Sequence, residues 1–178
     1  VIKSTTESLI GENAEITALG SGDGITNFTG VVDNATTRLV TKTRVEQDGT
    51  EIQDNYTVVD ANFQTATQRG LSMSAVTNED ITFTPIGAAG GGTAGLSGVI
   101  ATTVVSSTNR VKIGAGTTIN QMNENADAAQ DVTLVSASDS RLNNISAAVG
   151  IGTLGAAFDL DTQVYKKSVE ASVLGSVN

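Results

Sequence analysis

Apolar and polar residues alternate along much of the chain, with the period of two that half-buried β-strands show. The clearest runs lie at 81–84, 131–134 and 169–173. Glycine, asparagine and aspartate interrupt these runs, for example in "GSGDG" at 20–24 and in the Asp48-Gly49 pair. These residues tolerate the backbone conformations of tight turns. The pattern therefore predicts an all-β chain whose strands are joined by short corners.

Three segments fit this alternation less well. Helical periodicity is strongest at 123–130 and over part of 53–69, and the first of these is interpreted as a short turn or loop. The range 37–70 contains strand-like stretches around the Asp48-Gly49 turn signal. We therefore expect 37–70 to form a hairpin or loop that projects from the rest of the chain, where a binding function would be carried.

The chain repeats itself with an offset of about 60 residues. Residues 73–83 align with 134–144, and residues 92–105 align with 152–165. Each copy has the order strand, Gly/Ala-rich segment, strand. A regular repeat of this kind is typical of architectures in which each copy stacks on its neighbours.

A corner pattern, [Ile/Leu]-Gly-x-x-[Ala/Thr]-x-Ile, occurs in full twice. It begins at Ile10 and again at Ile113, and its first half occurs a third time at Leu174, with a slip of one residue. We interpret it as a strand, a glycine turn and a second strand. The third pattern would be completed by Ile2 of a following copy, which predicts that the two ends continue one another.

Composition supports a narrow, repetitive core. The sequence has four Phe, two Tyr and no Trp, so small and β-branched side chains must fill any interior. A single Pro also argues against separate domains joined by Pro-rich linkers. We therefore predict one β-solenoid segment over residues 1–178, without a start Met or signal peptide, as in a mature or excised piece.

Charge and residue types exclude several functional classes. The net charge is −9, which disfavours a nucleic-acid partner because phosphate binding needs clustered Lys and Arg. The chain has neither Cys nor His, so disulfides, thiolate metal sites and His-dependent triads are absent. No uninterrupted apolar run approaches the roughly 20 residues that span a bilayer, so no membrane insertion is expected.

Two long stretches resemble a known class of protein. These are "VIKSTTESLIGENAEITA" at 1–18 and "SAAVGIGTLGAAFDLDTQVYKKSVEASVLG" at 146–175. They resemble the repeat region of large secreted bacterial exoproteins of the leukotoxin and filamentous haemagglutinin-like adhesin type. The resemblance implies a right-handed parallel β-helix with coils of roughly twenty residues, so that an offset of 60 would be three coils.

The resemblance also implies a function. Such a segment would be a non-enzymatic structural shaft of an adhesin or toxin, located outside the cell or on the bacterial surface and acting in cell attachment. Its partners would be neighbouring copies of the same repeat, end to end, and a host-cell surface or matrix. It implies no catalytic residues and no cofactor.

Candidate sites are few. Asp159 and Asp161 lie two residues apart and face the same side of a predicted strand, so they are the candidates for a calcium site. A solvated acidic face is the favoured interpretation of this pair. The "GGGTAG" segment at 90–95 lacks the Lys-Ser/Thr of a phosphate-binding loop, and close backbone packing is the favoured explanation.

Two alternatives remain open. A β-helical polysaccharide lyase would use carboxylates with a basic residue, for which Arg38, Arg44, Arg110 and Arg141 are candidates. A self-assembling extracellular fibre subunit would instead be an antiparallel β-sandwich that exchanges a terminal strand. Activity on acidic polysaccharides would identify the lyase, and filaments formed by the isolated chain would identify the fibre subunit.

Overall fold

The fold was analysed in a computed structural model, which describes residues 1–45 and 50–178. Within these ranges it leaves undescribed the side chains at 34–38, 42, 44, 45, 54 and 56–62. Every regular element in the described residues is a β-strand, which confirms the all-β prediction. The strands are β1 (Ile2–Ile10), β2 (Glu15–Ile16), β3 (Ile25–Val45), β4 (Glu51–Phe83), β5 (Ile86–Gly90), β6 (Ala94–Ile113), β7 (Thr118–Ile119), β8 (Gln130–Asn144), β9 (Ala147–Ile151), β10 (Leu154–Val173) and β11 (Ser176–Val177).

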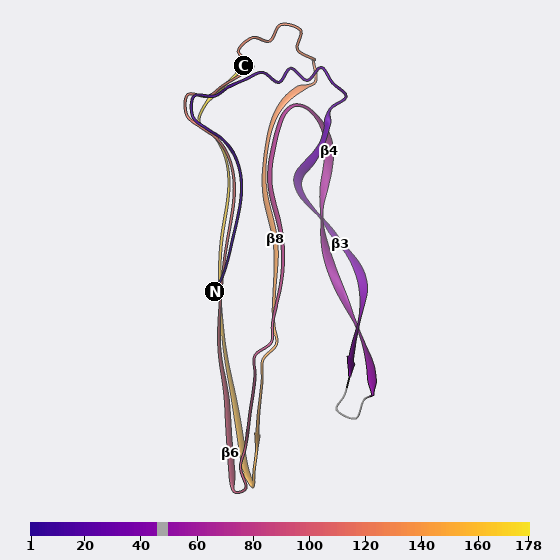
Figure 1. Cartoon of the computed structure of the whole chain (residues 1–178), viewed down its shortest axis with the longest axis vertical. Coiled ribbons are helices and arrows are strands. Elements are labelled where there is room, and N and C mark those ends of the chain that lie inside the picture. The colour runs from indigo at the N-terminus through magenta and orange to yellow at the C-terminus, as the bar shows by residue number, and fades with distance from the viewer. Residues whose placement is uncertain (46–49) are drawn as a thin grey trace.

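The strands form four small sheets that give the molecule an elongated shape (Figure 1). The sheet orders are β1-β6-β10, β11-β7-β2, β3-β4-β8 and β5-β9. All described strand pairs are parallel except β3–β4. This pairing differs from that of the antiparallel sandwich considered above. We call β1-β6-β10 the long wall, and we call β4-β8 together with β5-β9 the opposite wall.

The sequence repeat is the hydrogen-bonding register of these walls. Met73 pairs with Leu134 in β4–β8, and Val105 pairs with Tyr165 in β6–β10, as the alignment of the two copies predicts. The prediction of three twenty-residue coils in each offset is wrong, because residues 60 positions apart are direct neighbours on adjacent strands. Each copy of about 60 residues therefore supplies one strand to each wall.

The antiparallel pair of β3 and β4 is inserted into this arrangement. Its register runs from Ile25 opposite Gln68 to Val45 opposite Glu51, and the pair extends alongside the walls in Figure 1. The helix expected within 53–69 is wrong, because this segment belongs to β4, where pairing with β3 overrides its weak helical period. The range 37–70 lies within this pair, whereas the Asp48-Gly49 turn lies outside the described residues. Residues 123–129 form a turn-containing loop, as predicted.

The main core lies between the walls at the end where the corners are. Met73 and Ala75 of the opposite wall pack against Val111, Ile113 and Ile119. Partly buried apolar residues extend this cluster: Ile10, Ile16, Leu71, Val132 and Leu134. Alternate residues of β6 are buried along its whole length, because this strand has its inner side against the opposite wall.

The corners confirm the first two occurrences of the glycine pattern. Ile10 pairs with Ile113, and Ile16 pairs with Ile119. The predicted third occurrence needs correction, because Ile113 pairs with Val173 and not with Leu174. Val177 then pairs with Ile119, so the final position of the pattern is occupied within the chain and does not require Ile2 of another copy. The third corner is shorter, which accounts for the slip in the alignment.

Candidate functional site

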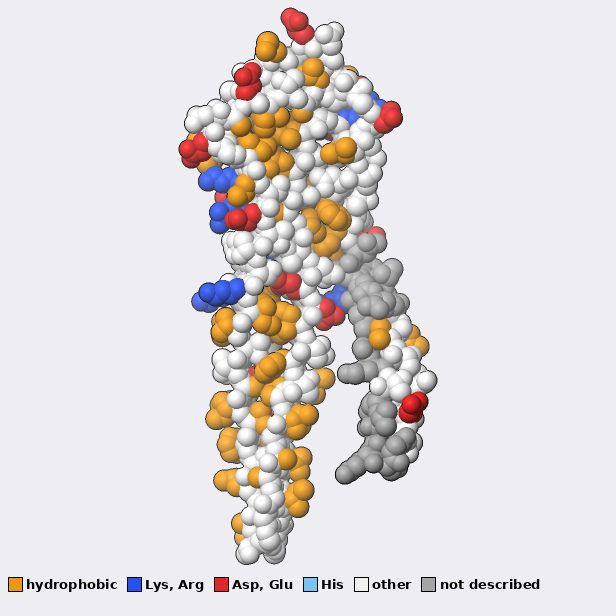
Figure 2. Space-filling view, viewed as in Figure 1, with side chains coloured by type: hydrophobic (Ala, Val, Ile, Leu, Met, Phe, Trp, Pro, Cys, Tyr) orange, Lys and Arg blue, Asp and Glu red, His pale blue; other side chains and the backbone are white. Residues whose placement is uncertain are grey.

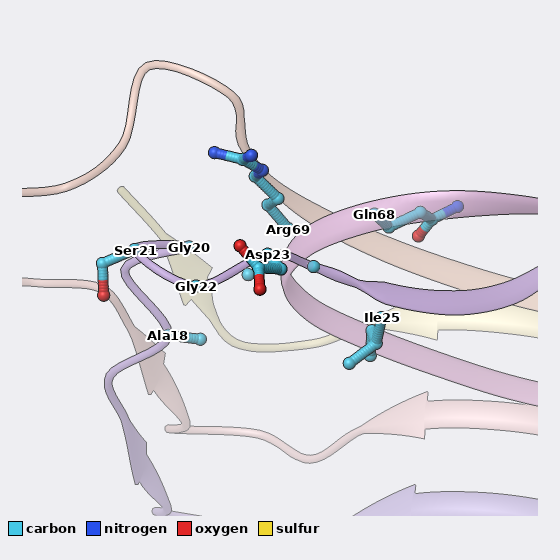
Figure 3. A pocket seen from close by; sticks show the side chains of 10 residues that line it. Ala18, Gly20, Ser21, Gly22, Asp23, Ile25, Gln68 and Arg69 are labelled. Atoms are coloured by element: carbon cyan, nitrogen blue, oxygen red, sulfur yellow. The ribbon is translucent and has the colours of Figure 1, made fainter.

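A pocket of about 340 Å³ lies where the chain enters and leaves the β3–β4 pair (Figure 3). One side is the glycine-rich segment after β2, and the other is the part of β4 that begins to pair with β8. The lining residues are Ala18, Gly20, Ser21, Gly22, Asp23, Gly24, Ile25, Gln68, Arg69 and Gly70. The pocket therefore belongs to the junction between the inserted pair and the repeat.

Three glycines give this junction its shape. Gly20, Gly24 and Gly70 have φ values of 69°, 91° and 102°, a region that other residues rarely adopt. A Cβ atom on Gly24 would lie 2.8 Å from the Thr67 Cγ2 atom and 2.9 Å from the Gln68 carbonyl oxygen. The "GSGDG" segment is thus required for a close backbone turn, which agrees with its interpretation as a corner.

The charged groups of the pocket do not form a catalytic arrangement. The Arg69 Nη1 atom lies 2.9 Å from Asp127 Oδ2, and both side chains are about one-third exposed, at 38% and 31%. Figure 3 shows the Arg69 side chain extending away from the glycine segment, toward the loop that precedes β8. Asp23 is the remaining charged lining residue. A general base paired with a nucleophile, as acid–base or covalent catalysis requires, does not line this pocket.

The predicted acidic pair lies elsewhere, on the inner side of the edge strand β10. Asp159 and Asp161 are in register with Val99 and Ala101, which are buried on β6. Ser146 donates a hydrogen bond to Asp159, and Asn144 donates one to Asp161. The pair is therefore hydrogen-bonded to the opposite wall and does not form the solvated face expected from the sequence.

The acidic pair falls short of a recognisable metal centre. Calcium takes six to eight oxygen ligands in proteins. Among the described residues, no group of three or more His, Cys, Asp or Glu side chains could hold a metal ion. The hydrogen bonds from Ser146 and Asn144 already occupy one oxygen of each carboxylate.

The "GGGTAG" segment forms the turn between β5 and β6. The Gly91 N–H donates to the Ile151 carbonyl at 2.9 Å, and the Leu154 N–H donates to the Thr93 carbonyl at 3.1 Å. A Cβ atom on Gly95 would collide with the Ile151 carbonyl oxygen. Close approach between neighbouring repeats therefore explains these glycines, and these backbone groups serve the stack.

The candidate bases of a lyase do not converge. Arg110 lies on the outer side of the long wall, with its Nη1 atom 3.4 Å from Glu7 Oε1 and its Nε atom 3.7 Å from Glu170 Oε2. Arg141 lies on the opposite wall, with its Nη2 atom 4.0 Å from Asp139 Oδ2. The side chains of Arg38 and Arg44 lie outside the described residues.

The Glu7–Arg110–Glu170 row was not anticipated from the sequence. Its three residues occupy the same register position on β1, β6 and β10. Extending the alignment of the repeats to the outward-facing positions would have placed the three charges together. This row and the pocket are the two polar features that the fold assembles from distant segments.

Comparison with known proteins gives no further indication of function. No protein-family model, no characterised protein and no solved structure matches the chain. A helix long and apolar enough to cross a membrane does not occur in the described part of the chain.

Proposed function

We propose that this chain is a non-enzymatic shaft segment of a large secreted or surface-displayed bacterial adhesin or toxin, and that it continues as a right-handed parallel β-helix. The observation that carries the proposal is the parallel, in-register pairing of successive repeats, which joins Leu154–Val173 to Ala94–Ile113 along their whole length. Such a stack gains stability from each neighbouring repeat and holds attached elements at a distance. Cell attachment would then be mediated by projecting elements such as the β3–β4 pair.

The two outer strands of the long wall support continuation of the stack. In the part of the chain that the structure describes, β1 and β10 each pair with β6 alone, so one backbone edge of each is free. A free edge is a template for a further strand. The long strand β10 offers this template over Leu154–Val173.

The charge row indicates which strand fits this edge. β10 carries Lys166 and Glu170 on its outer side, and β1 carries Lys3 and Glu7 at the same register positions. A second copy of either edge strand in register would place like charges directly opposite, which is unfavourable. A strand resembling β6, with Ser106 and Arg110 at these positions, provides the complementary pattern.

The proposal is tested by extending the chain by one repeat. We would attach residues 120–129 followed by a copy of residues 69–119 directly after Val177, because Val177 is in register with Ile119. The added β6 copy would then lie beside β10 with its arginine opposite Glu170. We expect the extended protein to melt cooperatively at a higher temperature, because a new interface between repeats is formed. The matched control carries Glu in place of the arginine in the added copy, and its gain should be smaller.

Two results would contradict the proposal. The added repeat could be digested by protease while the original chain stays intact, or the melting temperature could stay unchanged. Attachment itself is measured by the binding of the extended protein to cultured cells and to extracellular matrix. Binding should be lost when the β3–β4 pair is replaced by a short glycine linker between residues 20 and 69.

The free edge also favours the alternative of a self-assembling fibre subunit. In that case the unextended chain would form filaments by itself in electron micrographs, through pairing at β10. The like charges on the two outer strands argue against this outcome at low ionic strength, and high salt would weaken the argument.

A further inference from the structure

One end of the molecule is a thin two-layer projection, which we call the prong and define as residues 84–104 and 145–164. Its inner positions carry small side chains, such as Ala89 and Ser97. A Cβ atom on Gly87 would lie 2.6 Å from Val99 Cγ2, so the two walls are almost in backbone contact here. The prong therefore has no room for large apolar side chains between its walls.

The large apolar side chains of the prong point outward instead. On the long wall, Leu96 and Ile100 are 70% and 71% exposed, and Phe158 and Leu160 beside them are 51% and 57% exposed. The Phe158 ring lies across Gly98, its partner in the register. Adjacent repeats thus present apolar residues in matching rows on this face.

The face on the opposite wall has the same character. Ile86 and Ile151 are 73% and 67% exposed, and Val149 and Ile145 add to the surface at 48% and 55%. Figure 2 shows these hydrophobic side chains on both flanks of the prong. An exposed apolar surface of this extent marks an interaction site.

Charge is excluded from the prong and returns at its base. Residues 81–109 contain no charged side chain. The acids of the second copy, Asp159 and Asp161, lie on the inner side, where Ser146 and Asn144 donate to them. On the long wall the row that follows Val104 and Val164 contains two exposed lysines, Lys3 and Lys166, on either side of Ser106.

We propose that the prong inserts into a phospholipid bilayer. Stacking of further repeats would cover strand edges and leave both apolar faces uncovered, so another partner must cover them. A second protein copy would cover one face, whereas lipid surrounds a thin projection on both. Lysines at the end of an apolar surface are suited to lipid phosphates.

The dimensions of the prong agree with this partner. The apolar rows from Leu96 to Val104 span about 26 Å at roughly 3.3 Å per residue. The hydrocarbon core of a bilayer is about 30 Å thick. This inference departs from the expectation of no membrane insertion, which rested on uninterrupted apolar runs, and it does not depend on the proposed shaft function.

The test measures flotation of the 178-residue chain with phosphatidylcholine vesicles. We expect the protein to float with the vesicles. The variant Ile100→Thr/Leu160→Thr should reduce the partition coefficient at least about tenfold, because it removes apolar area from one row. Thr102 and Thr162 already occupy the neighbouring row, so the variant should keep its circular dichroism spectrum and melting temperature.

Leu39→Thr is the matched control, because Leu39 is 69% exposed on β3, outside the prong. It should float like the unaltered chain. Since the chain has no Trp, Leu96→Trp adds a single fluorescent reporter, whose emission should shift to shorter wavelength on addition of vesicles. Leu39→Trp should show no shift.

Three outcomes would overturn the inference. The first is that the unaltered chain stays at the bottom of the gradient. The second is that Leu39→Thr loses as much binding as the prong variant. The third is that light scattering shows a dimer that the prong variant abolishes, without flotation, which would assign the faces to a second copy.

Discussion

The stacking of the corners can be tested with two glycines that occupy the same position in adjacent repeats. Gly11 follows β1 and Gly114 follows β6, and both continue strands paired through Ile10 and Ile113. The Gly114 N–H donates to the Ile10 carbonyl at 2.9 Å. Neither glycine has a positive φ, so alanine meets no backbone penalty at either site. The two sites differ only in what lies against them.

The expected effects of alanine are opposite in sign. A Cβ atom on Gly114 would lie 2.5 Å from the Gly11 carbonyl oxygen and 2.6 Å from its carbonyl carbon, whereas a Cβ atom on Gly11 would meet nothing within 4 Å. Relieving a backbone overlap of this size costs about 1–3 kcal/mol in packed proteins. Gly11→Ala should instead stabilise the chain by about 0.4–1 kcal/mol, because it restricts the unfolded state.

Thermal unfolding followed by circular dichroism measures the difference. For a chain of this size each 1 kcal/mol shifts the melting temperature by about 2–4 °C, so Gly114→Ala should lower it by about 2–12 °C. Gly11→Ala should leave it unchanged or raise it slightly. Equal melting temperatures for the two variants, or a larger loss for Gly11→Ala, would refute the stacking of the first corner on the second.

Three further substitutions probe the interior, the charge row and the corner conformation. Asn109→Val should destabilise the chain by about 1–3 kcal/mol in urea unfolding, because the buried Asn109 amide donates across to Ala75 and Ala137 carbonyls of the opposite wall. Arg110→Glu should cost about 0–1 kcal/mol at low salt, since it places three acids in one row, and the loss should shrink as salt is added. Asn13 has a φ of 56°, so Asn13→Ala should melt below Asn13→Gly by the equivalent of about 1 kcal/mol.

The sequence was sufficient to predict which residues lie side by side. The alignment of 73–83 with 134–144 reproduces the register of β4 and β8, because identical environments in a stack select similar residues in each copy. The same reasoning predicts the pairing of Ile16 with Ile119 at the corners. Repetition made these contacts predictable, since the partner of each residue is its own counterpart in the next copy.

Other features could not be read from the repeat. The length of each coil was missed because an offset of 60 residues is compatible with one long circuit or with three short ones, and glycine corners mark both. The strand at 53–69 is determined by pairing with β3, which has no counterpart in the other copies. The pocket at 18–25 and 68–70 exists only because that inserted pair leaves and rejoins the chain there. The alignment does predict the Glu7–Arg110–Glu170 row, but only when its outward positions are considered.

The outward apolar residues of the prong follow from the same register that buries apolar residues near the corners. Near the corners, Met73, Val111 and Ile113 fill the space between the walls. In the prong, glycine, alanine and serine bring the walls together, so backbone hydrogen bonds and close contact hold the layers without large side chains. Folding of the prong therefore does not require Leu96, Ile100 or Leu160, which contribute little buried area inside the molecule. Their exposure on a surface without charge is better explained by an apolar partner than by the needs of the fold.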